Sequence, residues 1–537
     1  MGTGKYNSKI KKSFVLGGLV GTSGLFLAKA LGLVYSIPFS NILGSDAYMS
    51  YYGTSYRIYN YLLNIFTAGI PFAIASLVAK YLVKDDYKSV LRIKKISITM
   101  LTALGFAGML LMILFAQFIP YAITTADDVF LLKRALMLLS LAVFFVPILA
   151  ALRGYYQGQK EMSQYAFSQV FEQFFRVGFL LGCSYLFVYV WDMERKWALY
   201  ISVLSTSIAA IAAILQYLVF DNKKSDMVLQ GATQQREKGI SEKELRKELI
   251  TLAIPYLLMA ILGYSDDIIY SILIPIGLRM HGYTQSVMDT ILSAINYVGP
   301  KLNSIPLILA PGFVAALIPY MSEALGEGDY KKLRKYVTDC LQVVLYISFP
   351  IAMAIIFYAD GVYHTLFFTD DAQTSVWVLR CIAIEGAMAP FGIVIANMMV
   401  TLGMGKEGLR RMGIQCALKI VLIVPLIYLI GYIGIAFATI VGTLYIAGGN
   451  LKQIKAKYQV DFSHTVIRFV QICIAIIFMW VVHYLLRKAG LDFVEGPRMI
   501  CFMKMFVNGI ITAASYLVIT WCMKIPQSIL EIRRRKA

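Results

Sequence analysis

Residues 96–119 read ISITMLTALGFAGMLLMILFAQFI, a run of 24 residues without a charged side chain. A helix of about 20 apolar residues crosses the hydrocarbon core of a bilayer. Similar runs begin at Phe14, Trp197 and Val466, and 59% of all residues are apolar. The mean hydropathy of the chain is +0.68. The sequence therefore predicts an all-α, polytopic membrane protein.

We expect about fourteen membrane helices along the chain. The predicted segments are 13–37, 56–80, 96–119, 131–152, 165–190, 197–220, 248–276, 296–322, 336–358, 376–402, 411–430, 432–451, 465–486 and 500–523. Little polar sequence remains between them, and no stretch is long enough for a soluble domain with its own core. The function must therefore lie in what the helices enclose.

The net charge of +19 comes from basic residues in the short loops between these segments. If the N-terminus is cytoplasmic, 34 of the 50 Lys and Arg residues lie in the two termini and the even-numbered connections, and 9 lie in the odd-numbered ones. Short cytoplasmic loops carry the excess of basic residues. The pattern predicts that both termini are cytoplasmic, and it argues against a nucleic-acid partner.

The chain contains a weak internal repeat. Residues 71–78 (PFAIASLV) resemble residues 311–318 (PGFVAALI), and the fourth and tenth predicted helices each carry a central proline, Pro147 and Pro390. Two matches in the same register indicate a six-helix unit used twice. Six crossings return the chain to its starting side, so the two copies share one orientation, which is the parallel-repeat plan of many transporters.

This repeat predicts two pseudo-symmetric six-helix lobes and two additional helices. The N-lobe is expected to cover residues 1–222, and a cytoplasmic linker residues 223–247. The C-lobe is expected to cover residues 248–458, and the last two helices with a basic cytoplasmic tail residues 459–537.

Seven basic residues stand inside predicted membrane helices, among them Lys29 in the middle of the first and Lys301 near the start of the eighth. Charged groups at this depth are costly and normally face a bundle interior or a wet cavity. Since the two lysines belong to opposite lobes, both could line one cleft, where ammonium groups would attract an anion such as phosphate. The alternatives are snorkelling to an interface or a buried ion pair with an acid such as Glu385. Three other basic residues lie within a turn or two of helix ends, so we expect them to snorkel to an interface: Lys419, Arg468 and Lys504.

Further charged residues are candidates for coupling or for ion pairs. Asp266 and Asp267 are adjacent in the seventh helix and point about 100° apart. One of them could pair with a lysine, or the two could bind a coupling cation or proton. Glu172 and Arg176 lie four residues apart, so the spacing predicts a pair on one helix face.

Catalytic and metal-binding patterns are missing from the sequence. The seven cysteines show no paired spacing, so we expect neither a disulfide framework nor a metal site. No P-loop, nucleophile–base pair or metalloprotease motif is present. We therefore expect no catalytic residues and no cofactor, and we interpret the chain as a transporter.

One block of sequence is specific enough to indicate a family. Residues 153–159 read RGYYQGQ, and residues 168–176 read SQVFEQFFR. Together with residues 29–39 (KALGLVYSIPF), this block resembles the polysaccharide-exporter branch of the multidrug/oligosaccharidyl-lipid/polysaccharide superfamily. The likeness extends over nearly the whole chain. It is greatest to the lipid II flippases of Gram-positive bacteria, the MurJ-type and stage V sporulation B-like proteins.

The resemblance implies a 14-helix, two-lobe flippase in a bacterial cell membrane. Its substrate would be an undecaprenyl-diphosphate-linked saccharide, with the peptidoglycan precursor lipid II as the first candidate, and its last two helices would form a groove for the polyprenyl tail. Lys301 and Lys29 would stand at positions of substrate-binding cations. Tyr35 and Asn64 stand where Gram-negative-type flippases carry further arginines, and Arg57 is a candidate replacement.

The resemblance leaves several alternatives open. The substrate could be another lipid-linked polysaccharide, and a cation-coupled multidrug exporter would share the fold. Short exterior loops argue against a glycosyltransferase or polymerase, whereas a non-transporting scaffold of cell division stays open. Membrane lipid and the cell-wall synthesis machinery are the expected further partners. The energy would come from the membrane potential or from a cation bound near Asp266.

Overall fold

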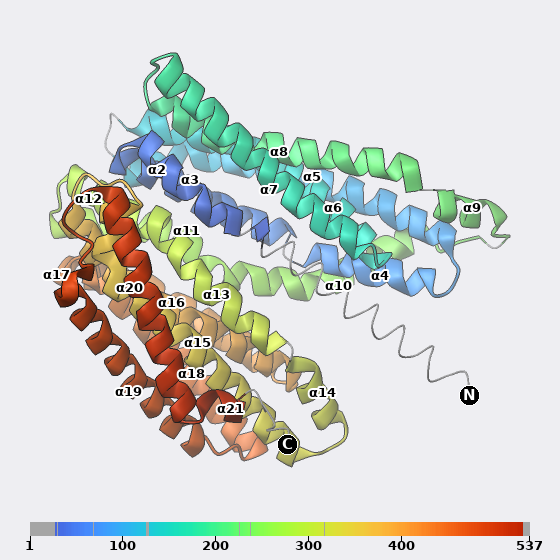
Figure 1. The fold of residues 1–537 in the computed structure, drawn as a ribbon. Helices are drawn as coiled ribbons and strands as arrows, with labels where there is room; N and C mark the ends of the chain where they lie inside the picture. Colours follow the sequence, from blue (N-terminus) through green and yellow to red (C-terminus); the bar gives the residue numbers. More distant parts are fainter. Residues whose placement is uncertain are drawn as a thin grey trace. The chain divides into compact units, whose positions relative to one another are not determined.

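The computed structural model describes residues 27–28, 30–67, 69–124, 128–224, 226–236, 238–315 and 317–529. Every regular element in these ranges is a helix (Figure 1). The helices are α2 (Ser36–Leu43), α3 (Asp46–Thr67), α4 (Ile70–Leu82), α5 (Tyr87–Ile123), α6 (Val129–Gly158), α7 (Met162–Tyr185), η1 (Leu186–Val190), α8 (Lys196–Lys224), α9 (Asp226–Gln234), α10 (Glu242–Gly263), α11 (Ser265–His281), α12 (Gln285–Ser293), η2 (Ala294–Val298), α13 (Gly299–Ala315), α14 (Ile318–Gly326), α15 (Tyr330–Thr365), α16 (Ala372–Thr401), α17 (Gly405–Ile430), α18 (Ile433–Tyr458), α19 (Ser463–Leu486), η3 (Arg487–Leu491), α20 (Arg498–Cys522) and α21 (Ile525–Ile529).

Within the described ranges, 12 helical stretches are long and apolar enough to cross a membrane. They correspond to twelve of the fourteen predicted segments, so the all-α polytopic fold is confirmed. Most of the first predicted segment, 13–37, lies outside the described residues. The eighth, 296–322, contains α13 and α14, which have 17 and 9 residues. The total of fourteen membrane helices stays a prediction.

The chain divides into two compact units. Unit 1 contains residues 1–44 and 51–272, and unit 2 contains residues 45–50 and 273–537. Two of the three boundaries fall inside helices, α3 and α11, and α10 belongs to unit 1 although the internal repeat predicts it in the C-lobe. The lobe limits derived from the repeat therefore stay a prediction.

In unit 1, the glycines of the block 153–159 explain how α6 packs on α4. A Cβ atom on Gly154 would lie 2.7 Å from the carbonyl oxygen of Pro71, and one on Gly158 would lie 2.6 Å from Cβ of Val78. Small residues four apart let two membrane helices approach backbone to backbone. The RGxxQG pattern is therefore in part a packing motif, and its partner is the first copy of the repeated PFAIASLV segment.

The linker that follows α8 is fastened to the N-terminus of α5. The amide group of Gln235 donates to Asp86 (2.8 Å) and accepts from the backbone N–H of Lys88 (2.9 Å). Arg92 donates to the carbonyl oxygen of Ile240 (2.6 Å), whose N–H donates to Ser89 (2.8 Å). We call these residues the linker clasp: Asp86, Lys88, Ser89, Arg92, Gln235, Gly239 and Ile240. The clasp makes residues 235–240 part of unit 1.

In unit 2, α15 is the central helix, and the two last membrane helices pack directly on it. Buried side chains of α15, α16 and α19 form one apolar cluster, which includes Val344, Met398 and Ile472. The hydroxyl group of Tyr516 on α20 donates to the carbonyl oxygen of Tyr346 on α15 (3.0 Å). The helices α19 and α20 are therefore an integral part of unit 2.

The first turn of α3 is bound within unit 2 through Asp46. This buried carboxylate accepts hydrogen bonds from the hydroxyl groups of Thr290 (3.1 Å) and Thr369 (2.9 Å) and from the N–H of Asp370 (2.8 Å). Asp370 in turn accepts from the N–H of Asp46 (2.8 Å). This reciprocal pairing satisfies a backbone donor at the start of α3 that lacks a helical partner.

Candidate functional site

The two lysines on which the predicted site depends are not both visible. Lys29 lies outside the described residues. Lys301 is in unit 2, half-buried in the first turn of α13, directly after the π-helical turn η2. Whether the two ammonium groups share one cleft stays a prediction.

Close packing of α13 on α16 positions Lys301. A Cβ atom on Gly299 would lie 2.2 Å from Cδ1 of Ile382, and one on Gly386 would lie 2.5 Å from Oδ1 of Asn303. The amide group of Asn303 donates to the carbonyl oxygen of Ile382 (3.0 Å). Contacts on both sides of Lys301 thus hold this turn of α13 in one orientation.

Glu385 immediately precedes the tightly packed Gly386. It lines a small cavity of about 10 Å³ between α16 and α18, together with Cys381 and Thr439. A cavity of this size holds roughly one water molecule. An ion pair between Glu385 and Lys301 stays a prediction.

The seventh predicted helix is interrupted, which changes the setting of its two acids. It ends as α10 at Gly263 and restarts as α11 at Ser265. Asp266 and Asp267 therefore stand in the first turn of α11, directly after a local kink at Tyr264 within one membrane-length stretch, Glu242–His281.

Asp267 pairs with Arg57 of α3, whose guanidinium nitrogen lies 3.5 Å from the carboxylate. The side chains of Arg57 and Asp267 are 12% and 26% exposed, so the pair is largely shielded from solvent. Arg57 also lies over the ring of Tyr270, 5.4 Å from its centre. The acid thus has an arginine as its partner, where the sequence suggested a lysine. Asn64 lies two helical turns after Arg57, on the same side of α3.

The predicted pair between Glu172 and Arg176 is wrong. The carboxylate of Glu172 pairs with Arg153 of α6 at 2.7 Å, and Arg153 also donates to Ser168 at 3.1 Å. Spacing within one helix placed Arg176 within reach, but it could not reveal that α6 presents a competing arginine to the same face of α7. Ser168, Glu172 and Arg153 thus join the two halves of the block that indicated the family.

Arg176 is held by tyrosines instead. It donates to the hydroxyl group of Tyr35 (2.9 Å) and lies over the rings of Tyr35 and Tyr56, at 5.6 Å and 5.7 Å from their centres. Tyr35 also forms a hydrogen bond with Tyr52 (2.9 Å). Arg176 therefore lies beside one of the two positions where the family comparison had suggested a missing arginine.

Sequence reasoning missed two features, the tyrosines around Arg176 and the burial of Lys419. The tyrosines at 35, 52 and 56 surround Arg176, and the spacing of Tyr52 and Tyr56 on one face of α3 was a signal for it. Lys419 was expected at an interface, but its side chain is buried (4% exposed), with α18 close to its aliphatic stem at Gly442. No group of three or more His, Cys, Asp or Glu residues suited to a metal occurs within the described ranges.

Sequence comparison decides the family. The family described as "Polysaccharide biosynthesis protein" matches residues 14–325, more than half of the chain. The chain belongs to this family. A second family, MatE, matches residues 285–424. The expected membership of the multidrug/oligosaccharidyl-lipid/polysaccharide superfamily is confirmed.

Two curated relatives of this family member, both from Bacillus subtilis (strain 168), cover most of the chain. The lipid II flippase MurJ is 26% identical over 471 residues, which are 85% of this chain and 84% of the relative. Stage V sporulation protein B is 22% identical and covers 69% of this chain and 70% of its own length.

Solved structures show the same fold. A lipid II flippase MurJ in an inward closed conformation aligns with a TM-score of 0.65 at 15% identity, over 94% of this chain and 99% of that one. An inward-facing multidrug resistance MATE family transporter aligns with a TM-score of 0.63 at 16% identity, over 80% and 95% of the two chains. With its 12 apolar helical stretches in the described ranges, the polysaccharide biosynthesis family member is a multi-pass membrane protein with the fold of these two solved structures.

Proposed function

We propose that this protein flips an undecaprenyl-diphosphate-linked saccharide, namely the peptidoglycan precursor lipid II, across a bacterial cell membrane by alternating access. The observation that carries the proposal is the similarity to the lipid II flippase of Bacillus subtilis over 85% of the chain. Both termini would be cytoplasmic, and the cell-wall synthesis machinery would receive the product.

The physical problem of such a reaction is the diphosphate. A doubly charged group cannot cross hydrocarbon at a useful rate unless it is solvated by protein or water. Lys29, Lys301 and Arg57 would provide positive charge for it, and Asn64 a polar contact, while the polyprenyl tail stays in the lipid. The partly buried positions of Lys301 on α13, Arg57 on α3 and Arg176 on α7 support this role.

The charge of Arg57 is available only in part, because Asp267 lies 3.5 Å away. A diphosphate that binds Arg57 would compete with Asp267 for the same guanidinium group. We propose that this competition links substrate binding to the kinked helix α10–α11. A cation or proton taken up by Asp266 or Asp267, or the membrane potential, would supply the energy.

A leaflet-accessibility assay tests the function. Labelled lipid II is followed in cells whose only lipid II flippase is this protein, with a membrane-impermeant hydrolase added outside. The proposal expects cleavage that depends on expression of this protein. If lipid II stays protected while the protein is present in the membrane, lipid II is excluded as the substrate.

Replacement of Lys301 tests the binding site. We expect Lys301→Ala to abolish growth of cells depleted of their own flippase and Lys301→Arg to retain part of it, because the diphosphate needs a positive charge at this position. Lys504→Ala, which removes a half-buried lysine from α20 of the same unit, is the matched control and should support growth. Full growth with Lys301→Ala at normal protein levels would contradict the role of Lys301.

One observation favours a second candidate function, export of drugs. The MatE family matches residues 285–424, and a multidrug transporter shares the fold. Overexpression in a drug-sensitive strain distinguishes the two. A raised resistance that depends on Asp267, without any rescue of lipid II flipping, would favour the exporter.

A further inference from the structure

Unit 2 contains a polar hollow far in sequence from Lys301. It has a volume of about 610 Å³ and is lined by residues of α15, α16, α19 and η3. Small-molecule sites typically have volumes of about 300–1,000 Å³. Its lining residues are Ile356, Phe357, Arg380, Trp480, His483, Tyr484, Arg487, Lys488 and Asp492. None of the proposed substrate-binding residues Lys29, Arg57, Asn64 and Lys301 lines this hollow.

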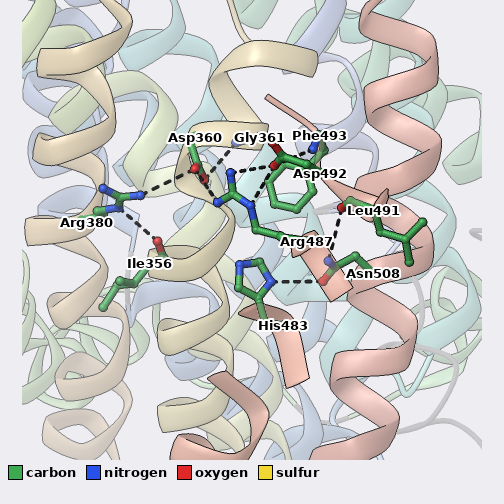
Figure 2. Close-up of polar contacts among 10 residues, drawn as sticks. All are labelled: Ile356, Asp360, Gly361, Arg380, His483, Arg487, Leu491, Asp492, Phe493 and Asn508. Carbon is green, nitrogen blue, oxygen red and sulfur yellow. Dashed lines mark hydrogen bonds and ion pairs between the residues drawn. The ribbon is translucent and has the colours of Figure 1, made fainter. Parts of the chain in front are cut away.

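A chain of ion pairs forms one wall of the hollow (Figure 2). Asp360 lies between two arginines, 2.9 Å from Nη1 of Arg487 and 3.8 Å from Nη2 of Arg380. Arg487 also pairs with Asp492 at 2.7 Å. With Lys488, three basic side chains face two acidic ones, so the hollow keeps a net positive charge.

Two of the three bases keep donors for a ligand. The 3.8 Å contact between Arg380 and Asp360 is long for a hydrogen bond, and Nη1 of Arg380 has no hydrogen-bond partner among the described residues. The ammonium group of Lys488 lies over the ring of Tyr484, 5.8 Å from its centre, and forms no ion pair within the described ranges. Arg487, by contrast, is paired with both Asp360 and Asp492 and links these two acids.

The aromatic residues indicate where the hollow lies relative to a membrane. Trp480 and Tyr484 stack on one another with ring centres 6.0 Å apart, and they are 48% and 49% exposed. Trp377, which lies under Arg380, is 52% exposed. Trp and Tyr concentrate at the level of lipid head groups. The distribution of basic residues predicts that this end of α19 lies on the exterior side.

The face of α19 below the hollow is apolar. Ile477 and Val481 precede Tyr484 at helical spacing and are 62% and 38% exposed. A ligand seated at Arg380 and Lys488 would therefore have hydrocarbon-compatible surface beside it. This favours an amphiphile with a phosphate group over a free anion, because arginine and lysine bind phosphate and the exposed apolar face suits acyl chains.

We propose that this hollow binds the phosphate group of an anionic membrane phospholipid, with Arg380 and Lys488 as its ligands. The lipid occupies the outer leaflet and lies against Trp480 and the apolar face of α19. The site is distinct from the substrate-binding residues and does not depend on lipid II being the transported molecule.

Native mass spectrometry of the purified full-length protein tests the site. Phosphatidylglycerol and the zwitterionic phosphatidylcholine are compared on the wild type and on the double variant Arg380→Gln/Lys488→Gln. The variant leaves the pairs of Arg487 intact, so the wall should persist. We expect binding of phosphatidylglycerol to fall at least about tenfold. The control Arg498→Gln/Lys504→Gln removes two charges from α20 of the same unit and should bind as the wild type.

A second experiment measures fluorescence quenching in the protein with Arg380 and Lys488 intact. Phosphatidylglycerol with brominated acyl chains should quench the fluorescence of Trp480, identified as the signal that Trp480→Phe removes. Inorganic phosphate up to millimolar concentration should compete weakly. Equal binding of the two phospholipids, or unchanged binding in the Arg380/Lys488 variant, would overturn the proposal. Phosphate that displaces the lipid stoichiometrically at low concentration would assign the hollow to a free anion instead.

Discussion

Three arginines of unit 1 have three different kinds of partner. Arg153 has a carboxylate partner at 2.7 Å, Arg57 has one at 3.5 Å and an aromatic ring, and Arg176 has tyrosine hydroxyls and rings. A cation held by neutral groups keeps its net charge, whereas a cation in a tight ion pair is neutralised. Arg176 is therefore the arginine in this set whose charge is least compensated by a neighbour.

Double-mutant cycles distinguish these partners. We expect Arg153→Gln and Glu172→Gln to be coupled in thermal stability by about 1–3 kcal/mol, because each leaves the other's charge buried without a partner. Glu172→Gln and Arg176→Gln should be additive within about 0.5 kcal/mol. The measurement is unfolding of purified protein in detergent, and a larger coupling for 172–176 than for 153–172 would refute the assignment of partners.

For helix pairs, α6 and α4 of unit 1 approach backbone to backbone. The atoms opposite Gly154 are backbone atoms of Pro71, which cannot move away as a flexible side chain could. The contact with Pro71 therefore leaves no room for a side chain at position 154 of the family block.

Replacement of Gly154 should be costly. An alanine methyl group would lie 2.7 Å from the carbonyl oxygen of Pro71, and such overpacking typically costs about 1–3 kcal/mol. We expect Gly154→Ala to lower the melting temperature by several degrees. Gly178→Ala on α7 is the control, since no atom lies within 4 Å of the added Cβ. If both variants melt alike, the packing role of the motif is wrong.

The linker clasp should respond to pH. Burial alone would raise the pKa of Asp86, but hydrogen bonds from Ser89, Gln235 and the N–H of Ile240 outweigh it and lower the pKa. Because the folded-state pKa is depressed, the stabilisation by Asp86 is complete above its unfolded value of about 3.9 and is lost as the pH falls through the folded value.

Cleavage by pepsin, which works in this acidic range, measures the effect. We expect residues 235–247 to become susceptible only when the pH falls below about 4. Asp86→Asn should be susceptible at every pH tested, because the amide cannot replace both hydrogen bonds accepted by the carboxylate. A linker that is cut equally in both proteins at pH 4 would exclude the clasp.

Sequence patterns predicted the helices well where apolar runs are long and continuous. The run at residues 96–119 lies within α5, and Val466 begins a run that lies within α19. The same sequence patterns failed where the backbone departs from a regular helix. The kink between α10 and α11 follows Gly263, a local signal that the hydropathy of residues 248–276 does not register. The side chain of Lys419 shows the same limit, because apolar character along α17 does not say which face a neighbour covers.

The candidate site was predictable by residue type but not by partner. A basic side chain in a membrane helix is a sound signal, and Arg57 and Lys301 are in membrane-spanning units at low exposure. Which acid meets which base depends on contacts between helices that are distant in sequence. Arg153 and Glu172 are 19 residues apart and come from different helices, so helical spacing alone favoured the wrong pair.

At the scale of the whole molecule, the orientation in the membrane rests on the distribution of Lys and Arg. Labelling of single cysteines in a background without the seven native ones tests it. We expect Asp192→Cys and Glu495→Cys to react with a membrane-impermeant maleimide in intact cells. Lys238→Cys and Lys331→Cys should react only after permeabilisation. The reverse pattern would invert the topology and move the phospholipid site to the inner leaflet.

The linker clasp also offers a way to follow the transport cycle. Since Gln235 is fastened to α5, a dye attached to the exposed residue Gln234 reports the motion of unit 1. A second dye on the exposed Cys522, at the end of α20, reports the motion of unit 2. Single-molecule energy transfer between these two reporters would then count the conformations that the protein visits, and their dwell times with and without substrate, in one molecule at a time.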